Sequence, residues 1–196
     1  MKRSANTAVA TMLVIWTSML ACGGMTAAAS GVKGARARRR QCRGTHLMPT
    51  GANLSRVLAA TLCLMDRERE AHHVSALLSN GYLQKIATRQ VDDMVIGKYF
   101  GDNSLTGMTP WQRITASRYA HGAPGLAAGQ NIGWGTGRLA TPAAMVAEWM
   151  RSPPHREIML SGAYRDVGVG VAPAAPHRVA RGMRGATYTA VFAAKG

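Results

Sequence analysis

One histidine lies in a setting that could support acid–base or metal chemistry. His155 follows two prolines in the run Ser-Pro-Pro-His-Arg. An imidazole titrates near neutral pH, so it can exchange a proton, and its nitrogens can bind a divalent metal. To act as a general base, the ring also needs an acid within hydrogen-bond reach to orient it. Glu148 precedes it on the chain, but a solvated helix face is the better interpretation of that position.

The polar residues just upstream are amides. Residues 129–135 read Gly-Gln-Asn-Ile-Gly-Trp-Gly. The side chain of Gln130 does not titrate near neutrality, so it cannot take or relay a proton as a carboxylate could. Amide oxygens are also poor zinc ligands. No Gly-x-Ser-x-Gly motif occurs, and no nucleophile triad of Ser or Thr can be assembled.

Two amphipathic helices are expected in the first half of the chain. Apolar residues recur at helical spacing over 53–70 and over about 80–97, which predicts a helix in each range. Asn53 can cap the first, and the second should stop at Gly97. Gln90 falls on the apolar side of the second helix and is therefore expected to be buried.

Two further helix starts and two strands complete the expected elements. Thr109-Pro110 and Thr141-Pro142 each place a capping residue before a proline, which is typical of helix starts. The last of these helices should end before Pro153. Residues 164–171 and 186–193 alternate with period two, as half-buried strands do. Helices before and between a few strands predict an α+β domain.

Six motifs occur in an order typical of one superfamily. They are Thr-Leu-Cys-Leu-Met-Asp-Arg-Glu-Arg at 61–69, Asp93-Met94 with Tyr99-Phe100, the 129–135 run, Trp-Met-Arg-Ser-Pro-Pro-His-Arg-Glu-Ile-Met-Leu at 149–160, Tyr-Arg-Asp-Val-Gly-Val-Gly-Val at 164–171, and Gly-Ala-Thr-Tyr-Thr at 185–189. Over about residues 42–194, this order resembles the CAP superfamily (cysteine-rich secretory proteins, antigen 5, pathogenesis-related 1), in the single-domain SCP-like form of secreted bacterial proteins. The resemblance implies a three-layer α-β-α sandwich with a small antiparallel sheet.

The resemblance also implies a cleft where family members gather histidines and acids, in some members around a metal. Family histidines fall on Gln90, Asp102 and His155, and the glutamate of the Gly-Glu-Asn motif falls on Gln130, with Asn131 beside it. Only Asp102 and His155 are competent ligands, fewer than the three that a zinc site needs. We therefore expect a degenerate cleft with no metal, no cofactor and no catalytic residue assigned.

Each of these residues also has a structural interpretation. Gln90 and Gln130 can hydrogen-bond each other or the backbone across the cleft, because buried polar groups need partners. His155 can cap a short helix, and Asn131 can bond the backbone at a strand end. Trp134 and Trp149 are expected in the core.

The N-terminus is expected to direct export. Two basic residues precede an apolar run over about 8–19 that is too short to span a bilayer comfortably, so residues 1–29 are interpreted as an export signal. Three alanines at 27–29 fit a cut before Ser30. Alternatively, Leu-Ala-Cys followed by glycines resembles a lipobox that would acylate Cys22. Both routes remain open.

The remaining cysteines predict a disulfide. Either route leaves only Cys42 and Cys63 in the folding chain. An even count in an oxidising compartment favours a Cys42–Cys63 bond.

The formal charge of +15 is concentrated after the signal. Because residues 30–52 combine basic residues with Gly and Ala, we expect them to form a largely disordered arm. The CAP domain is expected at 53–196. Anionic membranes or wall polymers attract such arms by about 1 kcal/mol per basic residue. No nucleic-acid-binding motif accompanies the charge, so no specific nucleic acid is expected as a partner.

Together these features predict an exported protein, either secreted or held as a lipoprotein on the outer side of the cytoplasmic membrane. We expect a non-enzymatic binding or interaction module at the bacterial envelope, with an unknown ligand such as a lipid or another envelope component. One alternative is a hydrolase or metal-dependent enzyme using His155. A second is an anionic-polymer binder acting through the basic arm, whose binding would collapse with salt.

Overall fold

The computed structural model describes residues 41–196. The expected export signal, Cys22 and residues 30–40 of the basic arm lie outside the described residues. In chain order the elements are η1 (Gly51–Asn53), α1 (Leu54–Ala71), β1 (Leu78–Ser79), α2 (Gly81–Gly97), α3 (Pro110–Thr115), β2 (Leu126–Thr136), η2 (Gly137–Ala140), α4 (Pro142–Arg151), α5 (Pro153–Leu160), β3 (Asp166–Ala172) and β4 (Gly185–Lys195). Between residues 41 and 196, none of the helices is both long enough and apolar enough to cross a membrane.

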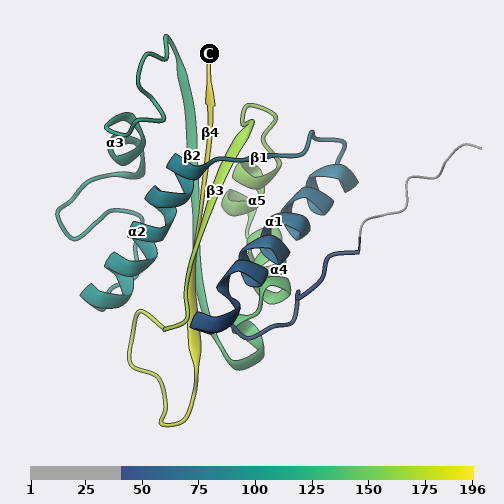
Figure 1. Ribbon diagram of the computed structural model, residues 1–196, viewed down its shortest axis with the longest axis vertical. Coiled ribbons are helices and arrows are strands. Elements are labelled where there is room, and N and C mark those ends of the chain that lie inside the picture. Colours follow the sequence, from purple (N-terminus) through teal and green to yellow (C-terminus); the bar gives the residue numbers. More distant parts are fainter. Residues whose placement is uncertain (1–40) are drawn as a thin grey trace, which may run out of the picture. The chain divides into compact units, whose positions relative to one another are not determined.

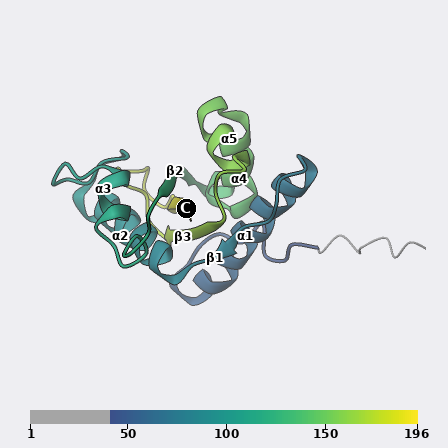
Figure 2. The ribbon, with the colours of Figure 1, turned by 90° about the horizontal axis from the view of Figure 1, so that it is seen from above.

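A four-stranded sheet in the order β1-β3-β4-β2 separates two helical layers. Helices α2 and α3 cover one face, and α1, α4 and α5 cover the other (Figures 1 and 2). This arrangement confirms the predicted α+β, three-layer fold. The sheet is mixed, however, because β1 pairs with β3 in parallel while the other pairs are antiparallel. The long connection from β1 through α2 to α5 supplies the crossover that a parallel pair requires.

The strand β2 was not among the expected strands. It pairs with β4 along its whole length, from Leu126 opposite Lys195 to Thr136 opposite Gly185. Glycines interrupt its apolar pattern, and glycine is a poor strand former. A Cβ at Gly129 would crowd Ile158 in α5 and Tyr164 after it, and one at Gly133 would overlap the Met145 side chain of α4. The glycines therefore allow close helix packing on this strand.

The expectation that the last two strands are half-buried is wrong. Nearly every residue of β3 and β4 is buried, because helices cover both faces of the sheet. The valines of β3 pack with the α1, α4 and α5 layer. The alternating Gly168 and Gly170 face α2, and a Cβ at either would fall on the backbone of that helix.

The helix starts expected at Thr109 and Thr141 are confirmed, whereas Asn53 holds the N-cap position of α1 without a side-chain hydrogen bond to that helix. Asn80 accepts hydrogen bonds from the first turn of α2, and Thr109 and Thr141 cap α3 and α4. After α4 the chain continues as the short helix α5 from Pro153, where proline is well suited to the first helical position. Ser152, not His155, holds the N-cap position of α5.

The domain begins before residue 53. Cys42 and Cys63 form the predicted disulfide, and Leu47 and Met48 pack against the main core. The carbonyl of Thr45 accepts a hydrogen bond from Ala143 N at 2.9 Å. The last residues of the expected arm, 41–52, therefore belong to the folded unit rather than to a disordered segment.

Loss of the disulfide should lower stability substantially. The bond closes a loop across a sequence separation of 21 residues. In the chain-entropy model, the double variant Cys42→Ser/Cys63→Ser should lose about 3 kcal/mol of unfolding free energy. Urea unfolding measures this loss of free energy, when the variant is compared with the native chain in the presence and absence of reductant. A variant as stable as the oxidised native chain would show that packing of residues 45–49 suffices without the bond.

Candidate functional site

Four polar side chains meet between the sheet and the α2–α3 layer. Gln90 lies on the sheet-facing side of α2 and is 1% exposed, and Gln130 lies on β2 and is 7% exposed. Asp102 comes from the loop after α2, and Arg113 comes from α3. We call these four residues the amide cluster. The strong burial of both glutamines agrees with the sequence-based placement of Gln90.

Hydrogen bonds join the cluster through Asp102. The Nε2 of Gln90 donates to Gly101 O at 2.9 Å and to Asp102 O at 3.4 Å. The Nε2 of Gln130 donates to the Asp102 carboxylate at 3.0 Å and to its carbonyl at 3.4 Å. The glutamines thus bond the loop backbone rather than each other, which is one of the two structural alternatives expected from the sequence.

An arginine completes the cluster. One Arg113 nitrogen, Nη2, donates to Gln130 Oε1 at 2.9 Å and to Asp102 O at 2.8 Å, while Nη1 donates to Met108 O at 2.6 Å. Burial lowers the pKa of Arg113, and the nearby Tyr99, Asp102 and Asp93 oppose that shift. The guanidinium therefore supplies positive charge directly beside Gln130.

Tyr99 borders the cluster and holds its proton firmly. Burial and then its hydrogen bond to Asp93 raise the pKa of Tyr99 to about 12. The hydroxyl donates to Asp93 Oδ2 at 2.6 Å. At neutral pH this phenol is a hydrogen-bond donor and not a base.

Two polar atoms of the cluster have no partner among the described residues. They are Gln90 Oε1, an acceptor, and Arg113 Nε, a donor. Buried polar atoms are usually paired. Neither atom is exposed to solvent, so a polar group must enter the cluster to bond either of them.

Asn131 and His155 lie on the opposite face of the sheet. Consecutive strand residues point to opposite faces, so Asn131 points away from the amide cluster. Its Nδ2 donates to the carbonyl of His155, in α5, at 2.9 Å. The residues carried over from the family therefore form two groups, with Gln90, Asp102 and Gln130 on one face and Asn131 and His155 on the other.

The imidazole of His155 has no acid partner within residues 41–196. No hydrogen bond or ion pair to its ring occurs there, and Glu148 pairs instead with the exposed Arg151. Glu148 therefore lies on a solvated helix face, as expected. The Asp102 carboxylate accepts from Gln130 instead.

The cluster does not fit the metal that the family resemblance implies for some members. Across the described part of the chain, no three His, Cys, Asp or Glu side chains gather as a metal site. In the amide cluster only Asp102 is a good ligand. The Arg113 guanidinium bonds the oxygen of Gln130, so a cation would meet an existing positive charge.

Arg113 was missed by sequence reasoning. The Thr109-Pro110 helix start predicted its helix, but nothing in the local pattern indicates that a long basic side chain reaches across to β2.

The two tryptophans expected in the core differ in their burial. Trp149 is 1% exposed and donates to Ile132 O, as expected for the core. Trp134 is 36% exposed and packs edge-on against His177, so its expected core position is wrong.

Two pockets lie away from the amide cluster. One of about 470 Å³ lies between residues 46–48, 137–141 and 182–184. A smaller one of about 270 Å³ lies beside Arg69, Tyr164 and Arg165. Neither is lined by a residue of the cluster.

Solved structures share this fold at low sequence identity. An extracellular protein from Bacillus anthracis that contains an SCP domain is 22% identical, with a TM-score of 0.54 over 74% of this chain and 43% of that one. An outer surface protein from Borrelia burgdorferi is 15% identical, with a TM-score of 0.55 over 76% and 96%. A cysteine-rich secretory protein from Staphylococcus aureus is 20% identical, with a TM-score of 0.50 over 75% and 40%.

This chain spans less than half the length of the Bacillus and Staphylococcus proteins. At these identities the likeness concerns the fold alone. Among curated proteins, none matches the sequence. The family model described as CAP, the cysteine-rich secretory protein family, matches residues 62–192. Because that match covers more than half of the chain, the protein belongs to the CAP family of cysteine-rich secretory proteins.

Proposed function

We propose that this protein is an exported binding module of the bacterial envelope whose family cleft no longer supports catalysis. The main support for the proposal is the pair of hydrogen bonds made by the Gln130 side chain. Its oxygen accepts from Arg113 and its nitrogen donates to Asp102. A neutral amide held between a cation and a carboxylate offers neither a proton nor a metal ligand.

The free polar atoms of the cluster support binding. Gln90 Oε1 and Arg113 Nε are a buried acceptor and a buried donor without partners in the described part of the chain. A ligand with a neutral polar group, such as a hydroxyl or an amide, can satisfy both.

Exposed apolar side chains on the segment that supplies part of the cluster support a ligand that is largely apolar. The segment that runs from the end of α2 into α3 carries five large hydrophobic side chains exposed to solvent, namely Ile96, Phe100, Leu105, Met108 and Trp111. This segment also supplies Asp102 and the carbonyl of Met108 that holds Arg113. Ligand sites commonly combine apolar walls with a few fixed polar groups.

The hydrolase alternative lacks the partner that it requires. A catalytic His155 needs an acid to orient its ring. Within residues 41–196 the two candidate acids are used elsewhere, Glu148 by Arg151 and Asp102 by Gln130. The binding module is therefore the better-supported function.

The second alternative, binding of anionic polymers through the arm at 30–52, depends largely on residues 30–40, which lie outside the described part of the chain. Export, by either processing route, remains part of the proposal. It is supported by the apolar run at 8–19, by the disulfide and by the fold shared with an extracellular and an outer surface protein.

A zinc titration tests the degenerate cleft. The native chain should bind Zn²⁺ no better than a single surface histidine does. The double variant Gln90→His/Gln130→Glu adds two ligands beside Asp102, which gives the three that zinc needs on one face of the sheet. We expect its affinity for Zn²⁺, measured by calorimetry, to rise more than about tenfold despite the opposing charge of Arg113.

A third substitution added to the double variant identifies which residues bind the zinc. Adding Asp102→Asn to the double variant should abolish the gain, because Asp102 Oδ1 already lies 3.0 Å from Gln130. Adding His155→Ala should leave the gain intact, because α5 lies across the sheet. Tight zinc binding by the native chain would refute the degenerate cleft and favour the metal-dependent alternative.

A further inference from the structure

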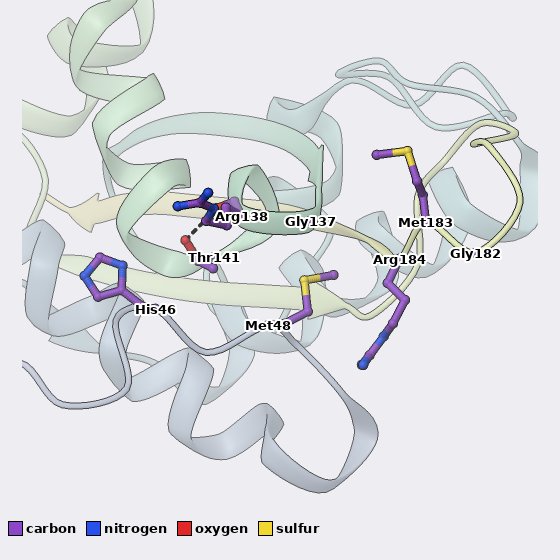
Figure 3. A pocket seen from close by; sticks show the side chains of 8 residues that line it. All are labelled: His46, Met48, Gly137, Arg138, Thr141, Gly182, Met183 and Arg184. Atoms are coloured by element: carbon purple, nitrogen blue, oxygen red, sulfur yellow. Dashed lines mark hydrogen bonds between the residues drawn. The ribbon is translucent and has the colours of Figure 1, made fainter.

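The larger pocket lies at the end of the sheet where β2 enters η2 and the β3–β4 loop returns into β4. It is lined by His46, Met48, Gly137, Arg138, Thr141, Gly182, Met183 and Arg184 and has a volume of about 470 Å³. Figure 3 shows His46 and Arg138 on one side of Met48, and Met183 and Arg184 on the other. Such a volume suits a small organic molecule better than a bare ion.

The pocket is cationic and lacks an internal counterion. It is built from three segments, and residues 41–65, 103–147 and 167–196 contain no Asp or Glu. Among the described residues, the only ion pair joins Arg151 to Glu148 on α4. Arg138 and Arg184 therefore carry unpaired guanidinium groups on opposite sides of one pocket.

Hydrogen bonds anchor the main chain from which both arginines extend. Arg184 Nη2 donates to Pro49 O at 3.4 Å, which ties the side chain to the segment that carries Met48. Gly137 N donates to Arg184 O at 2.9 Å, and Thr141 Oγ1 donates to Arg138 O at 3.0 Å. Both arginines thus extend from main chain that is anchored by hydrogen bonds.

Apart from His46 and Thr141, the rest of the lining is apolar or open. Met48 and Met183 supply flexible thioether side chains, which adapt to varied ligand shapes. Gly137 and Gly182 have positive φ angles, and a Cβ built at either meets nothing within 4 Å. The main chain at these glycines is therefore accessible to a bound molecule.

We propose that this pocket binds a phosphate-bearing organic anion. Arg138 and Arg184 contact the phosphate oxygens, because a guanidinium matches phosphate geometry with paired donors. Met48 and Met183 contact the apolar part of the molecule. The same chemistry is present in a lipid headgroup and in a soluble phosphate ester. This site is separate from the amide cluster and does not depend on the function proposed for that cluster.

Phenyl phosphate is a suitable probe because it joins a phosphate to an apolar ring. The full chain with its disulfide intact is titrated by calorimetry at about 0.15 M salt, where long-range attraction is largely screened. The double variant Arg138→Gln/Arg184→Gln should weaken binding by more than about tenfold, since two charge-assisted contacts are lost. Inorganic phosphate should bind more weakly than phenyl phosphate, because it lacks the apolar contact.

A charge-matched control separates the pocket from general attraction. Arg178→Gln/Arg181→Gln removes the same amount of charge from the β3–β4 loop, which also carries Arg184, without touching a lining residue. It should change the affinity by less than about twofold. Equal losses in the two double variants, or no binding of phenyl phosphate to the native chain, would overturn the proposal. Thermal unfolding within about 2 °C of the native chain verifies that both variants are folded.

Vesicles distinguish the two sources of phosphate. A lipid headgroup is the ligand if vesicles containing phosphatidylglycerol bind the native chain and phenyl phosphate competes with them. In that case Arg138→Gln/Arg184→Gln also loses vesicle binding, and vesicles of pure phosphatidylcholine do not bind. If the pocket variant loses phenyl phosphate binding but keeps vesicle binding, the ligand is a soluble ester.

Discussion

Replacing Gly168 with alanine should cost more than about 3 kcal/mol of unfolding free energy, because the added methyl group meets main chain rather than a movable side chain. A Cβ at this position would fall on the backbone of Leu83 and Gln84 in α2. To relieve the overlap, the whole helix must move away from the sheet. That movement would loosen the core between α2 and β4, since protein interiors contain few voids.

The same movement would disturb the amide cluster. Gln90 lies on α2 and donates to Gly101 O at 2.9 Å, so displacement of the helix lengthens that bond. Urea unfolding measures the loss of stability. Gly81→Ala is the matched control, because it lies in the first turn of α2 with nothing within 4 Å of its Cβ. It should be neutral or stabilise by up to about 1 kcal/mol. If Gly168→Ala were as stable as this control, the packing of α2 would be adjustable.

The sequence predicted those elements whose signals are local. Helix starts at Thr109 and Thr141 depend on a cap followed by proline, and both formed as expected. The strand at 164–171 showed period two, yet the sequence could not reveal that both faces are covered. From the sequence alone, Gly168 and Gly170 suggest a solvent-exposed face of the strand. Only the structure shows that α2 packs on that face. Strand β1 has two residues, which is too short for a periodic signal.

The candidate site was predictable in part for the same reason. Helical spacing placed Gln90 on the buried side of α2, and the structure agrees. The separation of Gln130 from Asn131 follows from strand alternation, but only once β2 is recognised as a strand, and its glycines obscured that. Arg113 could not be found locally, because its bonds to Asp102 and Gln130 depend on how α3 packs against β2.

Arg69→Met is the second change with a large expected effect. Arg69 lies in α1, is 0% exposed, and donates only to carbonyl groups. Its Nε bonds Ser75 O at 2.7 Å, and Nη1 bonds Met159 O at 2.7 Å and Ser161 O at 3.0 Å. The last two carbonyls end α5, where the helix dipole favours a cation. One side chain thus joins α1 to the end of α5.

Two opposing effects decide the size of the loss. Burial lowers the pKa of Arg69, and the charge of Asp66 only partly opposes this, so removing the cation relieves a desolvation cost. Against this, methionine would leave four carbonyls without the guanidinium, that of Met159 buried and those of Ser75, Ser161 and Tyr164 partly buried. An unpaired buried carbonyl costs about 1–3 kcal/mol. We expect the unpaired carbonyls to dominate and Arg69→Met to lose about 3–5 kcal/mol of unfolding free energy.

Urea unfolding and amide hydrogen exchange together test this role of Arg69. Arg56→Met, an exposed position on the same helix, is the matched control and should change stability by less than about 0.5 kcal/mol. In the Arg69→Met variant, amides in the last turn of α5 should exchange faster than those of β4, because α5 loses its tie to α1 while the sheet remains paired. Unchanged exchange in α5 together with native stability would mean that packing, and not the guanidinium, holds this helix in place.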